Sequence, residues 1–130
     1  MSASISAPKT ASRTDILMEG RGLERTFVTG EVSVRALRGV DISLKRGELV
    51  VLLGHSGSGK STLLNILGGL DRATAGTLRF DGHDLTHASD DELTRYRRRS
   101  VGFVFQFYNL VAGLTAKKTC HWSQKSRKAR

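Results

Sequence analysis

The strongest constraint on this sequence is a phosphate-binding loop at residues 54–61, which reads Gly-His-Ser-Gly-Ser-Gly-Lys-Ser. Its glycines allow backbone angles closed to other residues, so successive N–H groups can turn inward around phosphate oxygens. The lysine of such a loop reaches the β and γ phosphates, and the hydroxyl after it is a ligand for magnesium. The residues expected to bind the nucleotide are Gly54, His55, Ser56, Gly57, Ser58, Gly59, Lys60, Ser61 and Thr62, with Ser61 also on Mg²⁺.

The flanking sequence supports this interpretation. Residues 48–53 form a short apolar run, as expected for a strand buried on both faces of a parallel sheet. Residues 61–70 carry leucine and isoleucine at helical spacing, and a helix N-terminus adds partial positive charge next to a phosphate. The alternative is a turn rich in glycine and serine that binds nothing. The strand, loop and helix together favour the phosphate loop.

The net charge of +9 is unevenly distributed. Six of the 21 basic residues lie in residues 117–130, which contain no acid, and the first 116 residues hold 15 basic and 12 acidic side chains. That balance is ordinary for a globular domain, so we expect no nucleic-acid partner. Residues 1–14 are expected to be a disordered leader rather than an organelle transit peptide. Apolar runs are far shorter than the roughly 20 residues that cross a bilayer, so a membrane role would need a partner.

The rest of the chain predicts an α/β fold. Residues 15–44 have strand-like spacing and indicate a small antiparallel layer before the parallel core. Residues 77–80 alternate and lead into Asp81-Gly82, which predicts a tight reversal. Ser89 and Glu92 form a capping box that predicts a helix start at about Ser89. The apolar run 101–105 predicts another strand, with Gln106 at its C-terminal end.

Phe27 has two interpretations. It lies on a predicted strand otherwise interrupted by charged residues. It is either a core or edge aromatic residue or a ring that stacks on a nucleobase, which is worth about 1 to 3 kcal/mol where it occurs. The pattern alone favours the first.

Residues 37–48, the phosphate loop, residues 69–71 and residues 101–106 together resemble the ATP-binding subunit of an ABC transporter, of the lipoprotein-releasing and macrolide-export type. The resemblance covers about residues 16–116. It implies a P-loop NTPase core of the ABC ATPase kind, with an antiparallel β layer at its N-terminus. It also implies that Phe27 stacks on adenine and that the loop and Lys60 hold ATP. Gln106 would be the Q-loop glutamine, which contacts both the Mg²⁺ site and the membrane subunit.

The resemblance implies domain limits as well. Residues 15–116 are expected to form a partial nucleotide-binding domain, incomplete at its C-terminus, and residues 117–130 a basic tail outside the family pattern. Reading the tail in a shifted frame allows Glu-Asn-Val and then an apolar segment, as the family has, which suggests a frameshift near codon 117. The competing interpretation is a genuine basic tail that binds nucleic acid or anionic lipid.

The chain contains neither a Leu-Ser-Gly-Gly-Gln signature nor an apolar strand ending in Asp-Glu (the Walker B element). The family hydrolyses ATP between two subunits, and the set of catalytic residues in this chain is incomplete. We therefore expect the chain to bind ATP weakly and not to hydrolyse it alone. The implied partners are a membrane-spanning transporter subunit and a second ATP-binding subunit, at the inner face of the cell membrane. The alternatives are a small P-loop kinase and a basic nucleic-acid-binding module.

Overall fold

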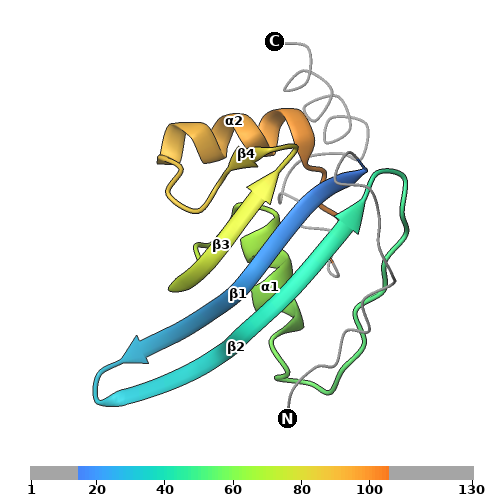
Figure 1. Ribbon diagram of the computed structural model, residues 1–130. Helices are drawn as coiled ribbons and strands as arrows, with labels where there is room; N and C mark the ends of the chain where they lie inside the picture. The colour runs from blue at the N-terminus through green and yellow to red at the C-terminus, as the bar shows by residue number, and fades with distance from the viewer. Residues whose placement is uncertain (1–14, 106–130) are drawn as a thin grey trace, which may run out of the picture.

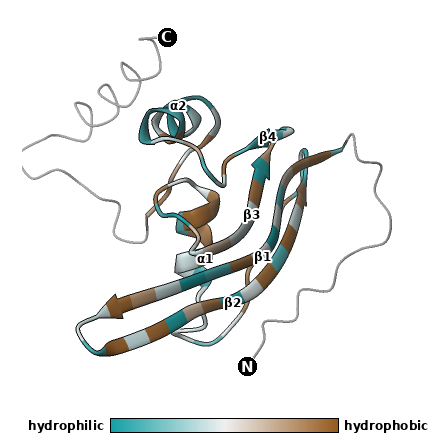
Figure 2. Cartoon of the chain, turned by 60° about the vertical axis from the view of Figure 1, so that its left-hand side comes forward, coloured by the Kyte–Doolittle hydropathy of each residue, from teal (hydrophilic) through white to brown (hydrophobic). Residues whose placement is uncertain are grey.

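A long antiparallel hairpin dominates the fold (Figure 1). The computed structural model describes residues 15–105, and within them strands β1 (Ile16–Thr29) and β2 (Val32–Lys45) pair from Ile16 opposite Lys45 to Thr29 opposite Val32. Figure 2 shows apolar and polar residues alternating along β2, as a strand with one covered face requires. The predicted antiparallel layer is therefore confirmed.

Two further strands extend the sheet on the other side of β1. Strand β3 (Ala75–Phe80) pairs antiparallel with β1, and the short β4 (His83–Asp84) pairs with β3, so the strand order is β2-β1-β3-β4. The turn between them has positive φ at both Asp81 (48°) and Gly82 (79°). Two such residues match the right-handed twist of paired strands, and the predicted reversal is confirmed.

Helix α1 (Lys60–Leu67) lies behind the sheet in Figure 1 and supplies much of the core. Leu23 of β1 is completely buried and belongs to one cluster with the buried face of α1. The cluster comprises Met18, Leu23, Leu37, Ile42, Leu63, Ile66, Leu67, Leu78 and Tyr96. The helix ends earlier than the predicted Leu70, because Gly68 and Gly69 follow and Gly69 adopts a left-handed φ of 71°.

Helix α2 (Asp90–Ser100) begins at the predicted capping box. The backbone N–H of Glu92 donates to Ser89 Oγ at 3.3 Å, and the N–H of Ser89 donates to Glu92 Oε2 at 2.7 Å. Farther along, the Tyr96 hydroxyl donates to the carbonyl oxygen of Leu67 at 2.7 Å, which ties α2 to the end of α1. Burial raises the pKa of Tyr96 to about 12.

Two apolar segments that we predicted as strands are not strands. Residues 48–53 and 101–105, called here the unpaired apolar segments, have no regular secondary structure. Leu49 and Val104 are 91% and 96% exposed. A strand needs a neighbour that accepts and donates its backbone hydrogen bonds, and none of the strands described between residues 15 and 105 pairs with either segment. The prediction of a parallel core strand was therefore wrong for the described part of the chain.

Candidate phosphate-binding site

The predicted phosphate loop leads directly into α1 and has the backbone geometry that its glycines allow. Gly57 and Gly59 have φ values of 75° and 88°, in the left-handed region. Gly59 is also the N-cap of α1, and no side chain caps the first turn of this helix. The free N–H groups of that turn are therefore available to an anion.

Close packing is a second reason for glycine in this loop. A Cβ atom on Gly59 would lie 2.5 Å from the carbonyl oxygen of Ala36, and one on Gly54 would lie 2.6 Å from Ser58 Oγ. The contact with Ala36 places the C-terminal end of the loop against β2. The loop therefore keeps a defined position although the segment before it forms no strand.

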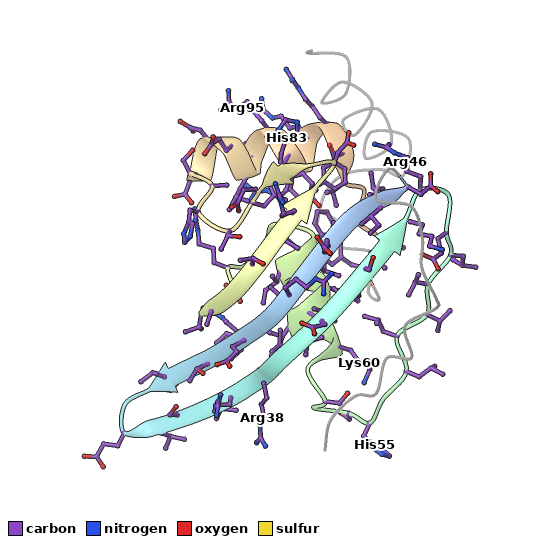
Figure 3. The ribbon with its side chains drawn as sticks, viewed as in Figure 1. Arg38, Arg46, His55, Lys60, His83 and Arg95 are labelled. Atoms are coloured by element: carbon purple, nitrogen blue, oxygen red, sulfur yellow. The ribbon has the colours of Figure 1, made fainter. Side chains whose placement is uncertain are left out.

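Lys60 turns back over the loop (Figure 3). Its ammonium group donates to the carbonyl oxygens of Gly54 at 2.8 Å and His55 at 2.6 Å and to Ser58 Oγ at 3.1 Å. All three acceptors belong to the loop itself, so the lysine draws the loop around its own positive charge. An incoming phosphate would find a cation and a set of backbone N–H groups already assembled.

The side chains of His55, Ser56, Ser61 and Thr62 take no part in this network. His55 lies at the outer part of the loop in Figure 3, and His55, Ser56 and Ser61 are exposed, whereas Thr62 is partly buried in the first turn of α1. The hydroxyl of Ser61 is the kind of hard oxygen donor that Mg²⁺ prefers. Across residues 15–105 there is no group of three or more His, Cys, Asp or Glu residues able to hold a metal ion.

The strand register relates the position of Phe27 to that of the loop. Gly59 packs against Ala36 and Leu37 of β2, and Leu37 is opposite Arg25 on β1. Phe27 is two residues farther along β1, which is about 7 Å at the rise of a strand. Phe27 is 40% exposed. Phe27 thus lies two residues beyond the part of the hairpin that contacts the loop, whereas Gln106 lies outside the described residues.

Sequence reasoning missed Arg25, whose guanidinium carbon lies 4.6 Å from the centroid of the Phe27 ring. It also missed Asp71, which forms an ion pair with Arg25. The i, i+2 spacing of Arg25 and Phe27 on one strand could have indicated the first contact, because alternate residues share a face. The contact with Asp71 depends on how α1 packs against the sheet, and no local pattern encodes it.

Comparison with known proteins identifies the class. A family model described as ABC transporter matches residues 37–130, a range that includes the tail we set apart. The chain is 50% identical over 113 residues to the macrolide export ATP-binding/permease protein MacB of Azoarcus sp. (strain BH72), covering 87% of this chain and 17% of that protein. It is also 50% identical over 102 residues to MacB of Marinobacter nauticus, of which it covers 16%.

Solved structures agree with this result. The dimeric structure of MJ0796, a bacterial ABC transporter cassette, matches with a TM-score of 0.80 and 40% identity, covering 85% of this chain and 48% of that one. A second structure of the MJ0796 cassette, bound to ADP and Pi, matches with a TM-score of 0.75 and 37% identity. The chain belongs to the ABC transporter family, and its fold is that of an ABC ATPase cassette in part. It spans about a sixth of the length of the curated relatives.

Neither α1 nor α2 has the length and apolar character needed to cross a bilayer, and no other helix occurs in residues 15–105.

Proposed function

We propose that this chain binds Mg²⁺–ATP as the nucleotide-binding part of an ABC transporter of the macrolide-export or lipoprotein-release type. The observation that carries the proposal is the loop at 54–59, drawn around the Lys60 ammonium and opening onto the uncapped N-terminus of α1. Residues 54–62 hold the phosphates, Phe27 stacks on adenine, and Ser61 with Gln106 serves the Mg²⁺ site. The magnesium ion would neutralise phosphate charge there.

We further propose that nucleotide binding is weak and that the chain alone does not turn ATP over. Phosphoryl transfer depends on positioning and on electrostatic stabilisation of the transition state. The 130 residues contain no Leu-Ser-Gly-Gly-Gln signature and no apolar strand ending in Asp-Glu, the two elements that the family places around the γ-phosphate. Lys60 and the loop then supply binding without the groups that position an attacking water.

The proposed partners are a membrane-spanning subunit and a second ATP-binding subunit, at the inner face of the cell membrane. MacB is named as an ATP-binding/permease protein, and MJ0796 has a dimeric structure. These names support the same arrangement for this chain. The residues proposed to face the partners include Gln106.

A binding experiment tests the proposal. Titration of the purified chain with Mg²⁺–ATP in a calorimeter should give saturable binding that Lys60→Ala weakens at least about tenfold, since charge-assisted contacts to phosphate are lost. Lys45→Ala, at the far end of β2, is the matched control and should bind as the wild type does. A folded chain that ignores Mg²⁺–ATP contradicts the binding proposal. Steady phosphate release that disappears with Lys60→Ala contradicts the proposal that the chain does not hydrolyse ATP alone.

The basic tail at residues 117–130 has its own test. We propose that its sequence results from a frameshift near codon 117. The nucleotide sequence should then encode Glu-Asn-Val and an apolar continuation in another frame. A nucleotide sequence without those codons would instead support a genuine basic tail, for which binding to nucleic acid should fall steeply with salt.

A further inference from the structure

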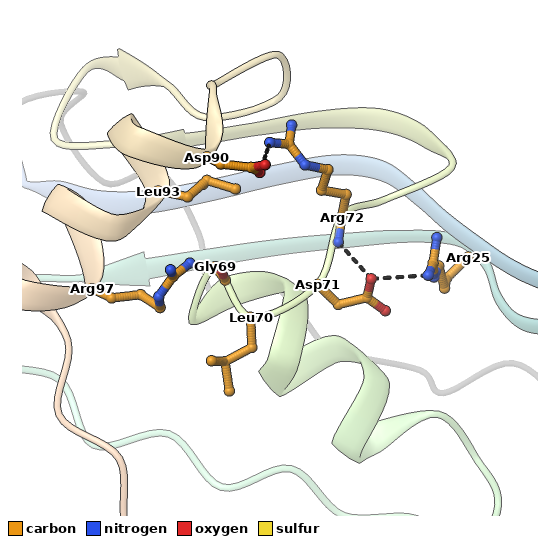
Figure 4. A pocket seen from close by; sticks show the side chains of 8 residues that line it. All are labelled: Arg25, Gly69, Leu70, Asp71, Arg72, Asp90, Leu93 and Arg97. Carbon is orange, nitrogen blue, oxygen red and sulfur yellow. Dashed lines mark hydrogen bonds and ion pairs between the residues drawn. The ribbon is translucent and has the colours of Figure 1, made fainter.

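Arg25 connects two elements that are far apart in the sequence. Its Nη2 lies 2.9 Å from Asp71 Oδ1, so strand β1 is joined to the segment that follows α1 (Figure 4). The same carboxylate oxygen accepts the backbone N–H of Arg72 at 2.8 Å. The Arg25 and Asp71 side chains are 25% and 26% exposed. This ion pair is partly desolvated, and water therefore screens it less than a fully exposed pair.

The other neighbour of the Arg25 guanidinium is the ring of Phe27. The distance of 4.6 Å from the guanidinium carbon to the ring centroid is within the range of a cation–π contact. Arg25 Nε is buried and has no hydrogen-bond partner among the described residues. The electron-rich face of the Phe27 ring is therefore the group that, besides Asp71, stabilises the guanidinium charge.

This contact leaves part of the Phe27 ring accessible. The guanidinium carbon lies over the ring, and Phe27 as a whole remains 40% exposed. An exposed aromatic side chain near the end of a hairpin would otherwise sample several rotamers, and fixing it on binding costs conformational entropy. Arg25 supplies that order before any ligand arrives.

The ion pair also relates the ring to the phosphate loop. Asp71 follows α1, and the N-terminus of α1 carries the loop and Lys60. Asp71 forms an ion pair with Arg25, and Arg25 contacts the ring of Phe27. The ring is therefore connected to the segment after α1 as well as to its own strand, β1. The position of the aromatic ring therefore depends on the packing of α1 as well as on β1.

We propose that Arg25, held by Asp71, is a positioning residue that fixes Phe27 for stacking on the purine base of a nucleoside triphosphate. This inference rests on the proposed function and adds to it a determinant of base recognition. Arg25 acts on the base through Phe27 and does not contact the phosphates. Its removal should therefore weaken binding of a ligand with a base and leave binding of a ligand without one unchanged.

The test compares Mg²⁺–ATP with inorganic tripolyphosphate, each titrated into the full chain in a calorimeter. Arg25→Met should weaken ATP binding about three- to tenfold, as loss of a partly desolvated cation–π contact predicts, with no change for tripolyphosphate. Arg25→Lys, which keeps the charge, should recover part of the loss. Asp71→Asn should weaken ATP binding in the same selective way. Arg35→Met removes the exposed ion pair with Glu24 on the neighbouring strand and should change neither affinity.

Each result decides the proposal. Equal weakening for both ligands would assign Arg25 a purely structural role and overturn it, as would an unchanged ATP affinity in Arg25→Met. If Arg25→Met does not fold, as judged by circular dichroism, Arg25→Lys carries the test, since it must still weaken ATP selectively. Two further variants separate this proposal from the proposed function. Lys60→Ala must weaken the binding of both ligands if the loop binds phosphate. An unchanged ATP affinity in Phe27→Ala would contradict both the stacking of Phe27 on the base and the role of Arg25.

Discussion

The β1–β2 hairpin and the unpaired apolar segments both carry apolar residues in runs typical of strands, yet only the hairpin forms strands. In the hairpin, each strand finds its partner after a two-residue turn, and β3 then pairs with the other edge of β1. Residues 48–53 and 101–105 have no paired neighbour in the described part of the chain. Apolar character therefore predicts a tendency to be buried, and strand formation requires hydrogen-bonding partners as well.

The largest expected contrast is between one leucine in each region. Leu23→Ala removes a completely buried side chain from the core and should lower the free energy of unfolding by about 2 to 5 kcal/mol. Leu49→Ala changes a side chain that is 91% exposed and should change that free energy by less than about 0.5 kcal/mol. Urea denaturation followed by circular dichroism measures both. Similar losses would mean that residues 48–53 are buried in solution.

A pair of glycines gives the next contrast. Gly76 on β3 has a φ of 96°, and an added Cβ would contact the backbone of Gly22 and lie 2.6 Å from the carbonyl oxygen of Arg21. Gly76→Ala should therefore lower the free energy of unfolding by about 1 to 3 kcal/mol. Gly102→Ala, in an unpaired segment with open space around the site, should have little effect on the same denaturation curve. A tolerated Gly76→Ala would contradict the close approach of β3 to β1.

A smaller effect is expected at the start of α2. Ser89→Ala removes the acceptor for the Glu92 N–H and should lower the free energy of unfolding by about 1 kcal/mol. Ser100→Ala, at the other end of α2, is the matched control and should change it less. The shift in thermal midpoint gives the comparison. Equal shifts would show that the capping box adds nothing to stability.

The smallest expected effect is a dependence on pH. Hydrogen bonds from the backbone and side chain of Ser89 hold the pKa of Glu92 below its ordinary value. A carboxylate with a lowered pKa stabilises the fold fully above its unfolded pKa of about 4.3, and this contribution is lost as the pH falls through the folded pKa. Glu92→Gln should therefore reduce the loss of stability in acid. A pH profile identical to that of the wild type would contradict this assignment.

The local features of the fold were predictable from short stretches of sequence. Asp81-Gly82 and the Ser89–Glu92 capping box each encode their geometry within four residues, and both occur as predicted. The phosphate loop was predictable for the same reason, since its glycines and Lys60 act over only seven residues. The lack of strand structure at 48–53 and 101–105 was not predictable, because strand formation depends on partners that no local pattern describes. The contacts among Arg25, Phe27 and Asp71 were missed because Asp71 is distant from the other two in the sequence.

The sequence by itself determined the turns, the helix start, the loop of glycines around Lys60 and the family to which the chain belongs. All of these depend on residues close together, whose backbone preferences and side-chain hydrogen bonds act over a few bonds. Tertiary structure decided which apolar runs became strands and which side chains surround Phe27. Those outcomes require contacts between residues distant in the sequence, such as Arg25 and Asp71, and such contacts exist only once α1 has packed against the sheet.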